Sequence, residues 1–226
     1  MFVKTTTFKS FNYNHIEKKA TFNYLVDHYS IDHYLDFKLL SETQYYNNLD
    51  PYLFLCGMAI YPFIFSKYNP KKILVSAGHL SAEQINYWKT WYLKGLGEFF
   101  YINKLKHEIN IENIKQPQKI NTDNLNLRNK ILLLNGGGKD SCVSGEILKE
   151  SKLNFEWLLI GNSSSQTGTL SVSPSKVKNI VISYQKIYVP NKYKIYNGHK
   201  PFTLYTSSIA ILVSALKRFR YIFLSK

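Results

Sequence analysis

The chain is organised around residues 130–149, which read KILLLNGGGKDSCVSGEILK. An apolar run from Ile131 to Leu134 meets three consecutive glycines, and the segment from Asp140 onward carries apolar residues at helical spacing. This order predicts a strand, a tight loop and a helix. Glycines let backbone N–H groups crowd around an anion, and the start of a helix adds unpaired donors and the positive end of its dipole. The stretch therefore predicts a phosphate-binding loop.

This loop has neither the Walker A spacing nor the GxGxxG pattern. It resembles instead the pyrophosphate-binding loop (PP-loop) of the N-type ATP pyrophosphatases, whose pattern is Ser-Gly-Gly-x-Asp-Ser. Lys139 fills the free position, and Gly136 stands where that pattern has Ser. A glycine-rich turn before an ordinary helix is the alternative, but the placement between strand and helix favours the PP-loop. The four matched positions are Gly137, Gly138, Asp140 and Ser141.

Each residue of the loop has an expected role toward ATP and Mg²⁺. Gly137 and Gly138 would allow the backbone to approach the phosphates closely, and Ser141 would donate to a phosphate oxygen. Gly136 is expected among the ATP-binding residues with them. Asp140 suits orienting the loop or holding Mg²⁺ better than touching phosphate, because two anions repel unless a cation lies between them. Lys139, or another lysine, would neutralise the charge that develops on pyrophosphate as it leaves.

The composition describes a folded protein with a strong positive charge. The hydrophobic fraction is 45%, which argues against disorder. The 29 basic and 15 acidic residues give a net charge of +14, and nearly all of the positive charge is lysine. This balance suits polyanions, including nucleic acid and phosphorylated small molecules. Because the lysines are scattered rather than gathered in one stripe, nucleic acid is the less favoured partner.

The cysteines and the apolar runs of the sequence indicate the cellular compartment of the protein. Cys56 and Cys142 lie far apart and have no CxxC partner, so the sequence predicts neither a zinc site nor a disulfide framework. The N-terminus lacks the apolar core of a signal peptide. The longest apolar run, Leu53 to Phe65, is too short to span a bilayer and is interrupted by a glycine and a proline. We expect a soluble, cytoplasmic protein without a membrane partner.

The N-terminal part, residues 1–115, reads as a smaller α+β domain that would bind substrate. Alternating apolar and polar residues predict an antiparallel meander of strands at 5–8, 20–26 and 34–39. Asp50-Pro51 marks a helix start before the apolar residues 52–64. A short strand is expected at 72–76, and a helix with a capping box begins at Ser81.

Residues 116–129 are polar and rich in asparagine, so we place a linker there, followed by a PP-loop ATP-binding domain at 130–226. Strands are expected at 131–134, 155–160, 179–183 and 221–224, with helices from Asp140 and over 203–217, and a polar loop over 162–175. Alternating strands and helices predict an α/β fold with a Rossmann-like parallel sheet. Since the sequence stops directly after the last of these strands, where ligand groups sit in such sheets, we expect an incomplete ATP-binding domain.

Two further stretches stand out. Residues 196–203, YNGHKPFT, precede a helix of small and apolar residues and place His199 in a connection. A lone histidine is usually structural, but a connection that leads to a strand edge is a common place for functional residues. Residues 92–103 contain Gly95 and Gly97 with Glu98 beside them. A helix end followed by a strand explains these glycines, and we assign Glu98 no role.

Taken together, residues 136–141, 197–203 and 95–103 resemble the UDP-N-acetylmuramoyl-L-alanyl-L-glutamate epimerases. Two departures accompany the resemblance. Residues 59–67, AIYPFIFSK, differ from the family's Ser-Tyr-Tyr-Lys-like stretch. Members of the family are also about twice as long, and continue after the equivalent of Leu224 into a Ser-Asn-Glu-like loop. The resemblance thus implies a chain that is truncated at its C-terminus, with impaired activity.

The resemblance implies ATP-dependent inversion of the terminal L-Glu of a UDP-linked muramyl dipeptide, in the synthesis of peptidoglycan precursors. Adenylation would make the α-proton removable, and His199 is our candidate for the base, with Lys139 as a second catalytic residue. Cys142 is a poor base, because a two-thiol racemase needs paired cysteines across its substrate. Two alternatives stay open: a PP-loop enzyme that adenylates for amide or thio transfer, including transfer on RNA, and a nucleotide-binding fragment without activity.

Overall fold

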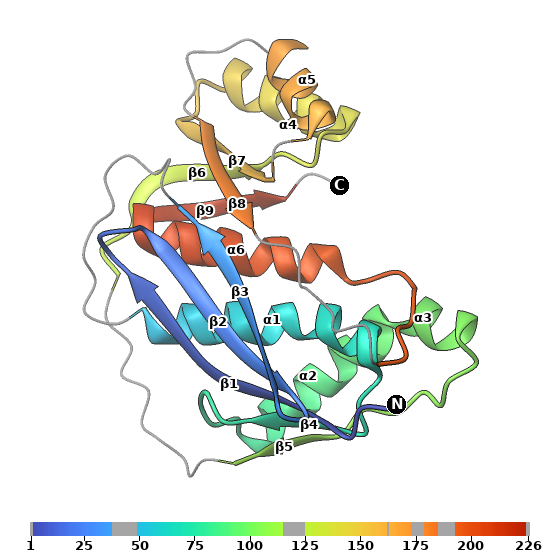
Figure 1. Ribbon diagram of the computed structural model, residues 1–226. Helices are drawn as coiled ribbons and strands as arrows, with labels where there is room; N and C mark the ends of the chain where they lie inside the picture. Colours follow the sequence, from blue (N-terminus) through green and yellow to red (C-terminus); the bar gives the residue numbers. More distant parts are fainter. Residues whose placement is uncertain are drawn as a thin grey trace.

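The computed structural model describes residues 2–37, 49–114, 125–161, 163–172, 179–184 and 193–224. Over these residues one mixed sheet of nine strands has the order β5-β4-β1-β2-β3-β8-β7-β6-β9 (Figure 1). The strands are β1 (Thr5–Asn14), β2 (Lys19–Val26), β3 (Tyr29–Asp36), β4 (Lys72–Val75), β5 (Ile111–Asn113), β6 (Arg128–Leu134), β7 (Phe155–Ile160), β8 (Asn179–Tyr184) and β9 (Phe219–Leu224). The helices are α1 (Asp50–Tyr68), α2 (Ala82–Gly95), α3 (Gly97–Ile102), α4 (Lys139–Glu150), α5 (Ser164–Val172) and α6 (Phe202–Lys217).

The first three strands form the antiparallel meander that the alternating sequence predicts. In β2, the side chains of Ala20, Phe22, Tyr24 and Val26 are all fully buried, and the residues between them are less so. This alternation gives the strand one core face. The short strands β4 and β5 extend the sheet beyond β1 in parallel pairing. The meander is thus confirmed.

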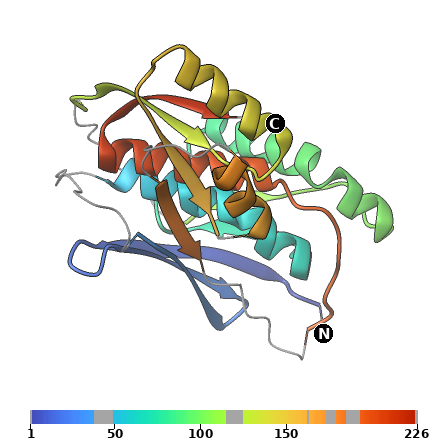
Figure 2. The ribbon, with the colours of Figure 1, turned by 90° about the horizontal axis from the view of Figure 1, so that it is seen from above.

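The last four strands form a parallel sheet in the order β8-β7-β6-β9. Figure 2, seen from above, shows α4 and α5 over one face of these strands, and α6 covers the other. The side chains of Leu133, Trp157 and Leu159 form a separate small core under α4 and α5. The predicted α/β class is therefore confirmed, while the assignment to the PP-loop type stays a prediction.

Helices α1 and α6 pack against each other in the main core (Figure 1). Pro62 lies inside α1 and has no backbone N–H, so the carbonyl of Met58, four residues earlier, loses its helical partner. The Tyr92 hydroxyl of α2 donates to this carbonyl at 2.5 Å. The Tyr24 hydroxyl of β2 donates to the carbonyl of Gly57 at 2.7 Å. Two buried tyrosines thus fasten α1 to its neighbours.

The domain boundary stays a prediction. Residues 115–124, which make up most of the predicted linker 116–129, lie outside the described residues, and β6 begins at Arg128 within it. Strands from the two parts meet where Leu35 and Asp36 of β3 pair antiparallel with Tyr184 and Ser183 of β8. Residues from both parts also share the main core cluster.

Two local predictions were wrong. The stretch predicted as a polar loop over 162–175 contains α5, which begins after Ser163. Ser163 Oγ accepts from the N–H of Gln166, and the Gln166 side chain accepts from the N–H of Ser163, so a capping box starts this helix. The second error concerns the strand expected after Gly95. That segment is the short helix α3, in which Phe99 and Phe100 are buried.

Candidate functional site

The loop between β6 and α4 contains three glycines, and the fold requires only one of them. Gly137 has φ +81°, and a Cβ atom there would lie 2.6 Å from Ser165 Oγ. A Cβ on Gly136 would meet one atom, Ser141 Oγ, at 3.8 Å, and a Cβ on Gly138 would meet nothing within 4 Å. The backbone conformation and the close packing at position 137 therefore require glycine. Those at 136 and 138 leave open backbone at the surface.

Hydrogen bonds hold this loop in shape. The N–H of Gly136 donates to Ser141 Oγ at 3.0 Å, and the N–H of Gly137 donates to Asn135 Oδ1 at 2.8 Å. Asn135 is 1% exposed. Its amide donates to the carbonyl of Gln166, and the Gln166 amide donates back to the carbonyl of Asn135 at 3.0 Å. This reciprocal pair fastens the loop to α5.

The N-terminus of α4 opens toward solvent. Its N-cap is Gly138, and no side chain caps the helix. The first turn of a helix has unpaired N–H groups and the positive end of the dipole, which together favour an anion. Lys139 and Asp140, in the same turn, are exposed. Because the N–H groups of Gly136 and Gly137 are bonded within the loop, it is the first turn of α4 that offers backbone donors, together with one ammonium group and one carboxylate.

A pocket of about 190 Å³ lies beside the loop, at the carboxyl ends of β6, β7 and β9. Ligands of open parallel sheets bind at this edge. The first turn of α6 forms the opposite wall. The lining residues are Leu134, Asn135, Gly136, Ile160, Gln166, Phe202, Thr203, Thr206 and Leu224.

The two other stretches noted in the sequence pack against each other. Asn103 Nδ2 donates to the carbonyl of Asn197 at 2.6 Å. A Cβ on Gly198 would lie 2.9 Å from the Cα of Phe99, and one on Gly95 would lie 2.8 Å from the Cβ of Pro201. These glycines are therefore needed for close packing of α3 and the end of α2 against residues 196–201. That segment continues directly into the first turn of α6 and the wall of the pocket.

Positive charge gathers where this segment passes the end of α1. The N–H of Tyr196 donates to the carbonyl of Lys67 at 3.1 Å. The pKa of Lys67 is lowered because its side chain is partly desolvated and because the ammonium group of Lys200 is close. Lys200 also donates to the carbonyl of Gly198 at 3.3 Å.

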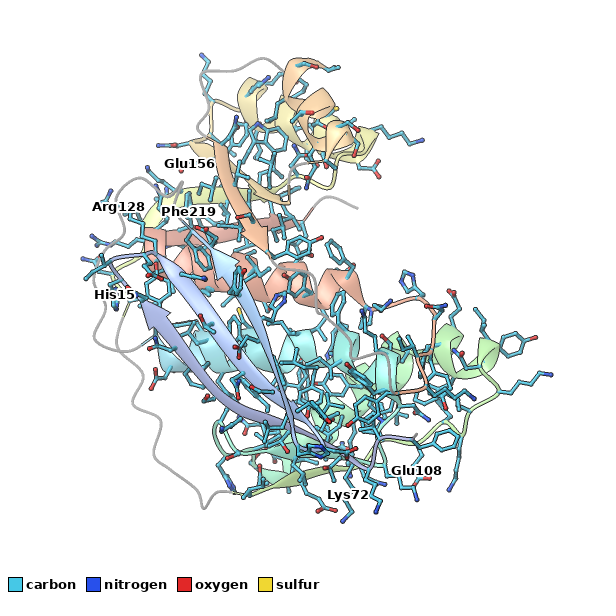
Figure 3. The ribbon with its side chains drawn as sticks, in the orientation of Figure 1. His15, Lys72, Glu108, Arg128, Glu156 and Phe219 are labelled. Atoms are coloured by element: carbon cyan, nitrogen blue, oxygen red, sulfur yellow. The ribbon has the colours of Figure 1, made fainter. Side chains whose placement is uncertain are left out.

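A second charged group lies at the other end of the parallel strands. Glu156 is 5% exposed, and its oxygens lie 3.6 Å from Lys130 Nζ and 3.7 Å from Lys217 Nζ. Figure 3 shows Glu156 near Arg128 and Phe219, the first residues of β6 and β9. Since ligands bind at the carboxyl edge, we interpret this group as structural: two lysines compensate a carboxylate that is buried on β7.

The predicted site residues fall into two places. Gly136–Ser141 lie together at the start of α4, and Gly136 also lines the pocket. His199 is exposed on the segment that leads into α6, and neither it nor Lys139 or Asp140 lines the pocket. Their predicted roles stay predictions. Among the described residues, no group of three or more His, Cys, Asp or Glu side chains is arranged to hold a metal ion.

The sequence interpretation missed four polar residues of the pocket. These are Asn135, Gln166, Thr203 and Thr206. The capping pattern Ser163-x-x-Gln166 is the signal that would have found the start of α5, and with it Gln166. Cys56 is buried, Cys142 is half-buried, and both are free thiols. No helix in the described parts of the chain is long and apolar enough to cross a membrane.

Comparisons with known proteins agree with the resemblance noted in the sequence. The MurL N-terminal domain family matches residues 2–226. A UDP-N-acetyl-alpha-D-muramoyl-L-alanyl-L-glutamate epimerase from Xanthomonas oryzae pv. oryzae (strain MAFF 311018) is 30% identical over 149 residues, which are 65% of this chain and 33% of that relative. The matched stretch thus spans a third of the relative's length. No solved structure matches the chain. Since the family match covers nearly every residue, the chain belongs to the MurL N-terminal domain family.

Proposed function

We propose that this chain carries the ATP-binding part of an enzyme that inverts the terminal L-Glu of UDP-MurNAc-L-Ala-L-Glu to D-Glu. One observation carries the proposal. In a chain of the MurL N-terminal domain family, a braced glycine loop meets an uncapped helix N-terminus beside a pocket at the carboxyl edge of parallel strands. Such an edge with open backbone donors suits a nucleotide phosphate.

The residues of the loop fit ATP and Mg²⁺. The glycines at 136 and 138 have no packing reason, which is the pattern expected where a phosphate approaches the backbone. Mg²⁺ is usually held by one or two carboxylates together with phosphate oxygens and water, so Asp140 alone is a sufficient protein ligand. When bound there, Mg²⁺ would neutralise charge on the phosphate oxygens. Lys139, in the same turn, would stabilise the negative charge of departing pyrophosphate.

Activation by ATP explains how a glutamate α-carbon can be inverted. The proton beside a free carboxylate is very weakly acidic, because its removal places a second negative charge on the same group. Conversion of the carboxylate to an acyl-adenylate removes the first charge, so that an enolate can form. The proton then returns on the opposite face, and hydrolysis releases the D-Glu product with AMP.

His199 is the proposed base. A histidine can accept and return a proton near neutral pH, and His199 is exposed on the segment that leads into the pocket wall. Contacts of Asn197 and Gly198 with α3 fix the backbone on its N-terminal side. A second acid must deliver the proton from the other face.

The test resolves glutamate enantiomers after incubation of the peptide substrate with ATP, Mg²⁺ and the protein combined with the remaining part of a MurL-family epimerase. We expect the complete enzyme to produce D-Glu, AMP and pyrophosphate. The variant His199→Gln should still bind ATP but produce no D-Glu. Absence of D-Glu from a complete enzyme that still binds ATP would exclude the proposal. AMP release that requires RNA and falls steeply with salt would instead support an adenylating enzyme that acts on RNA.

A further inference from the structure

Strand β9 forms an edge of the sheet and is unusually apolar for such a position. Among the described residues, β6 is the one strand that pairs with it. Four consecutive large side chains are substantially exposed: Tyr221 (51%), Ile222 (36%), Phe223 (46%) and Leu224 (42%). Proteins usually protect such edges with charges, bulges or a covering element, because an open apolar edge pairs with other chains. An element that covers β9 is thus expected.

The register assigns these four side chains to both faces of the sheet. Tyr221 and Phe223 pair with Ile131 and Leu133 of β6, so they point to the face that α4 and α5 cover. Ile222 and Leu224 pair with Leu132 and Leu134, and point to the face of α6. Leu132 and Leu133 are fully buried, whereas their partners on β9 are not. The helices therefore bury β6 but cover β9 incompletely: α6 contacts β9, yet Ile222 and Leu224 on its face stay partly exposed.

A second copy of the chain is a poor occupant of this edge. Each copy has a net charge of +14, which opposes the association of two copies. The same charge favours a partner with an acidic surface. The Xanthomonas relative, in addition, has about two thirds of its length outside the matched stretch, and the matching family is described as an N-terminal domain.

We propose that β9 docks a polypeptide equivalent to the part of the relative that follows its counterpart of Leu224, which adds a strand parallel to β9 and covers both of its faces. Parallel pairing follows the pattern of β8, β7, β6 and β9. Parallel crossovers are right-handed, and the step from β8 to β9, which moves outward in this sheet, carries α6 on its face. A helix connected to a strand added beyond β9 would therefore lie beside α6, over Ile222 and Leu224. The partner thus supplies both the strand and the missing cover.

The position of β9 links this surface to the pocket. Leu224, its last residue, lines the pocket at the carboxyl edge. The added parallel strand would end at the same edge, so the loop that follows it would reach the pocket and supply groups to the site. This second step rests on the proposed function, whereas the docking itself does not.

The experiment titrates the chain with the portion of the Xanthomonas oryzae epimerase that follows its counterpart of Leu224, expressed as a separate polypeptide. Sedimentation measures the association, and hydrogen exchange locates it. We expect a one-to-one complex and slower exchange over residues 219–224. The double variant Tyr221→Lys/Phe223→Lys should weaken the complex roughly 100-fold, because it places two charges in an apolar interface.

Val172→Lys is the matched control. Val172 is 74% exposed on α5, and its replacement adds a charge to an exposed apolar site away from β9. It should change the affinity by less than about twofold. Three results would each overturn the proposal. The first is that no complex forms, and the second is that Val172→Lys weakens the complex as much as Tyr221→Lys/Phe223→Lys does. The third is a homodimer of this chain that Tyr221→Lys/Phe223→Lys disrupts. A complex that protects β9 but makes no D-Glu would uphold the docking and reject the proposed function.

Discussion

Replacing Gly137 and Gly138 one at a time by alanine separates a structural glycine from a ligand-binding one. Gly137 has φ +81°, and its new Cβ would lie 2.6 Å from Ser165 Oγ and 3.0 Å from the backbone nitrogen of Gln166. The left-handed conformation costs an L-residue about 1–2 kcal/mol, and displacement of Ser165 adds to it. We expect Gly137→Ala to lower the free energy of unfolding by about 1–3 kcal/mol.

Gly138→Ala should behave differently. Gly138 has φ −102° and ψ 173°, which alanine adopts freely, and its Cβ would meet nothing within 4 Å. Alanine is a poorer N-cap than glycine, but it also reduces the entropy of the unfolded chain, so the two effects roughly cancel. We expect the free energy of unfolding to change by no more than about 0.5 kcal/mol. Affinity for Mg·ATP should fall at least about tenfold, or ~1.4 kcal/mol, because in the proposed site the methyl group would take the space of a phosphate oxygen.

The assay combines urea denaturation with calorimetric titration of Mg·ATP for both variants and the unmodified chain. Titration of Gly138→Ala at a temperature well below its unfolding transition separates affinity from stability. Unchanged affinity in Gly138→Ala would refute the interpretation of this position as a phosphate contact. Unchanged stability in Gly137→Ala would refute the loop geometry itself.

Three further predictions concern the bracing of the site and core. Tyr92→Phe leaves the Met58 carbonyl without its hydrogen bond and should lower the free energy of unfolding by about 1–3 kcal/mol. Adding Pro62→Ala supplies a helical N–H to that carbonyl and should recover part of the lost stability. Denaturation of the wild type, both single variants and the double variant measures this. Gln166→Leu removes the side-chain amide bonds to the carbonyls of Asn135 at the loop and Ile160 at the end of β7. It should lower the free energy of unfolding by about 2–3 kcal/mol and weaken Mg·ATP binding, with Thr167→Ala as the exposed control. Burial raises the pKa of the Cys56 thiol from 9.0 to about 12, so the unfolded chain loses this proton first and stability falls as the pH rises between these values. Cys56→Ala should reduce that alkaline slope by up to about 1.4 kcal/mol per pH unit, and an unchanged slope would contradict the burial.

The sequence predicted most strands and helices because their patterns are local. The alternation in β2 and the capping box of α2 each lie within one short window. Helix α5 was not predicted, because its residues, SSQTGTLSV, show no apolar periodicity. It packs through Gln166 and Thr169, both buried polar residues that bond to the backbone. Polar helices of this kind are defined by tertiary contacts that no local pattern reports.

The candidate site was predicted in part for the same reason. Residues 136–141 carry a contiguous pattern, so the glycine loop between β6 and α4 could be located from the sequence. The exchange of hydrogen bonds between Asn135 and Gln166 joins residues 31 positions apart and depends on the folded sheet. The packing of Gly198 on Phe99 and of Gly95 on Pro201 is likewise a tertiary contact. The sequence singled out each stretch, but it did not place residues 95–103 beside residues 196–201.

Hydrogen exchange with and without Mg·ATP tests the central claim most directly, since it asks where the nucleotide binds. Protection reports backbone N–H groups that become bonded or shielded. If the loop binds the phosphates, residues 136–141 should exchange more slowly with nucleotide, and so should the first turn of α6 across the pocket. Slower exchange elsewhere with no change at residues 136–141, or no change anywhere at saturating Mg·ATP, would contradict the account.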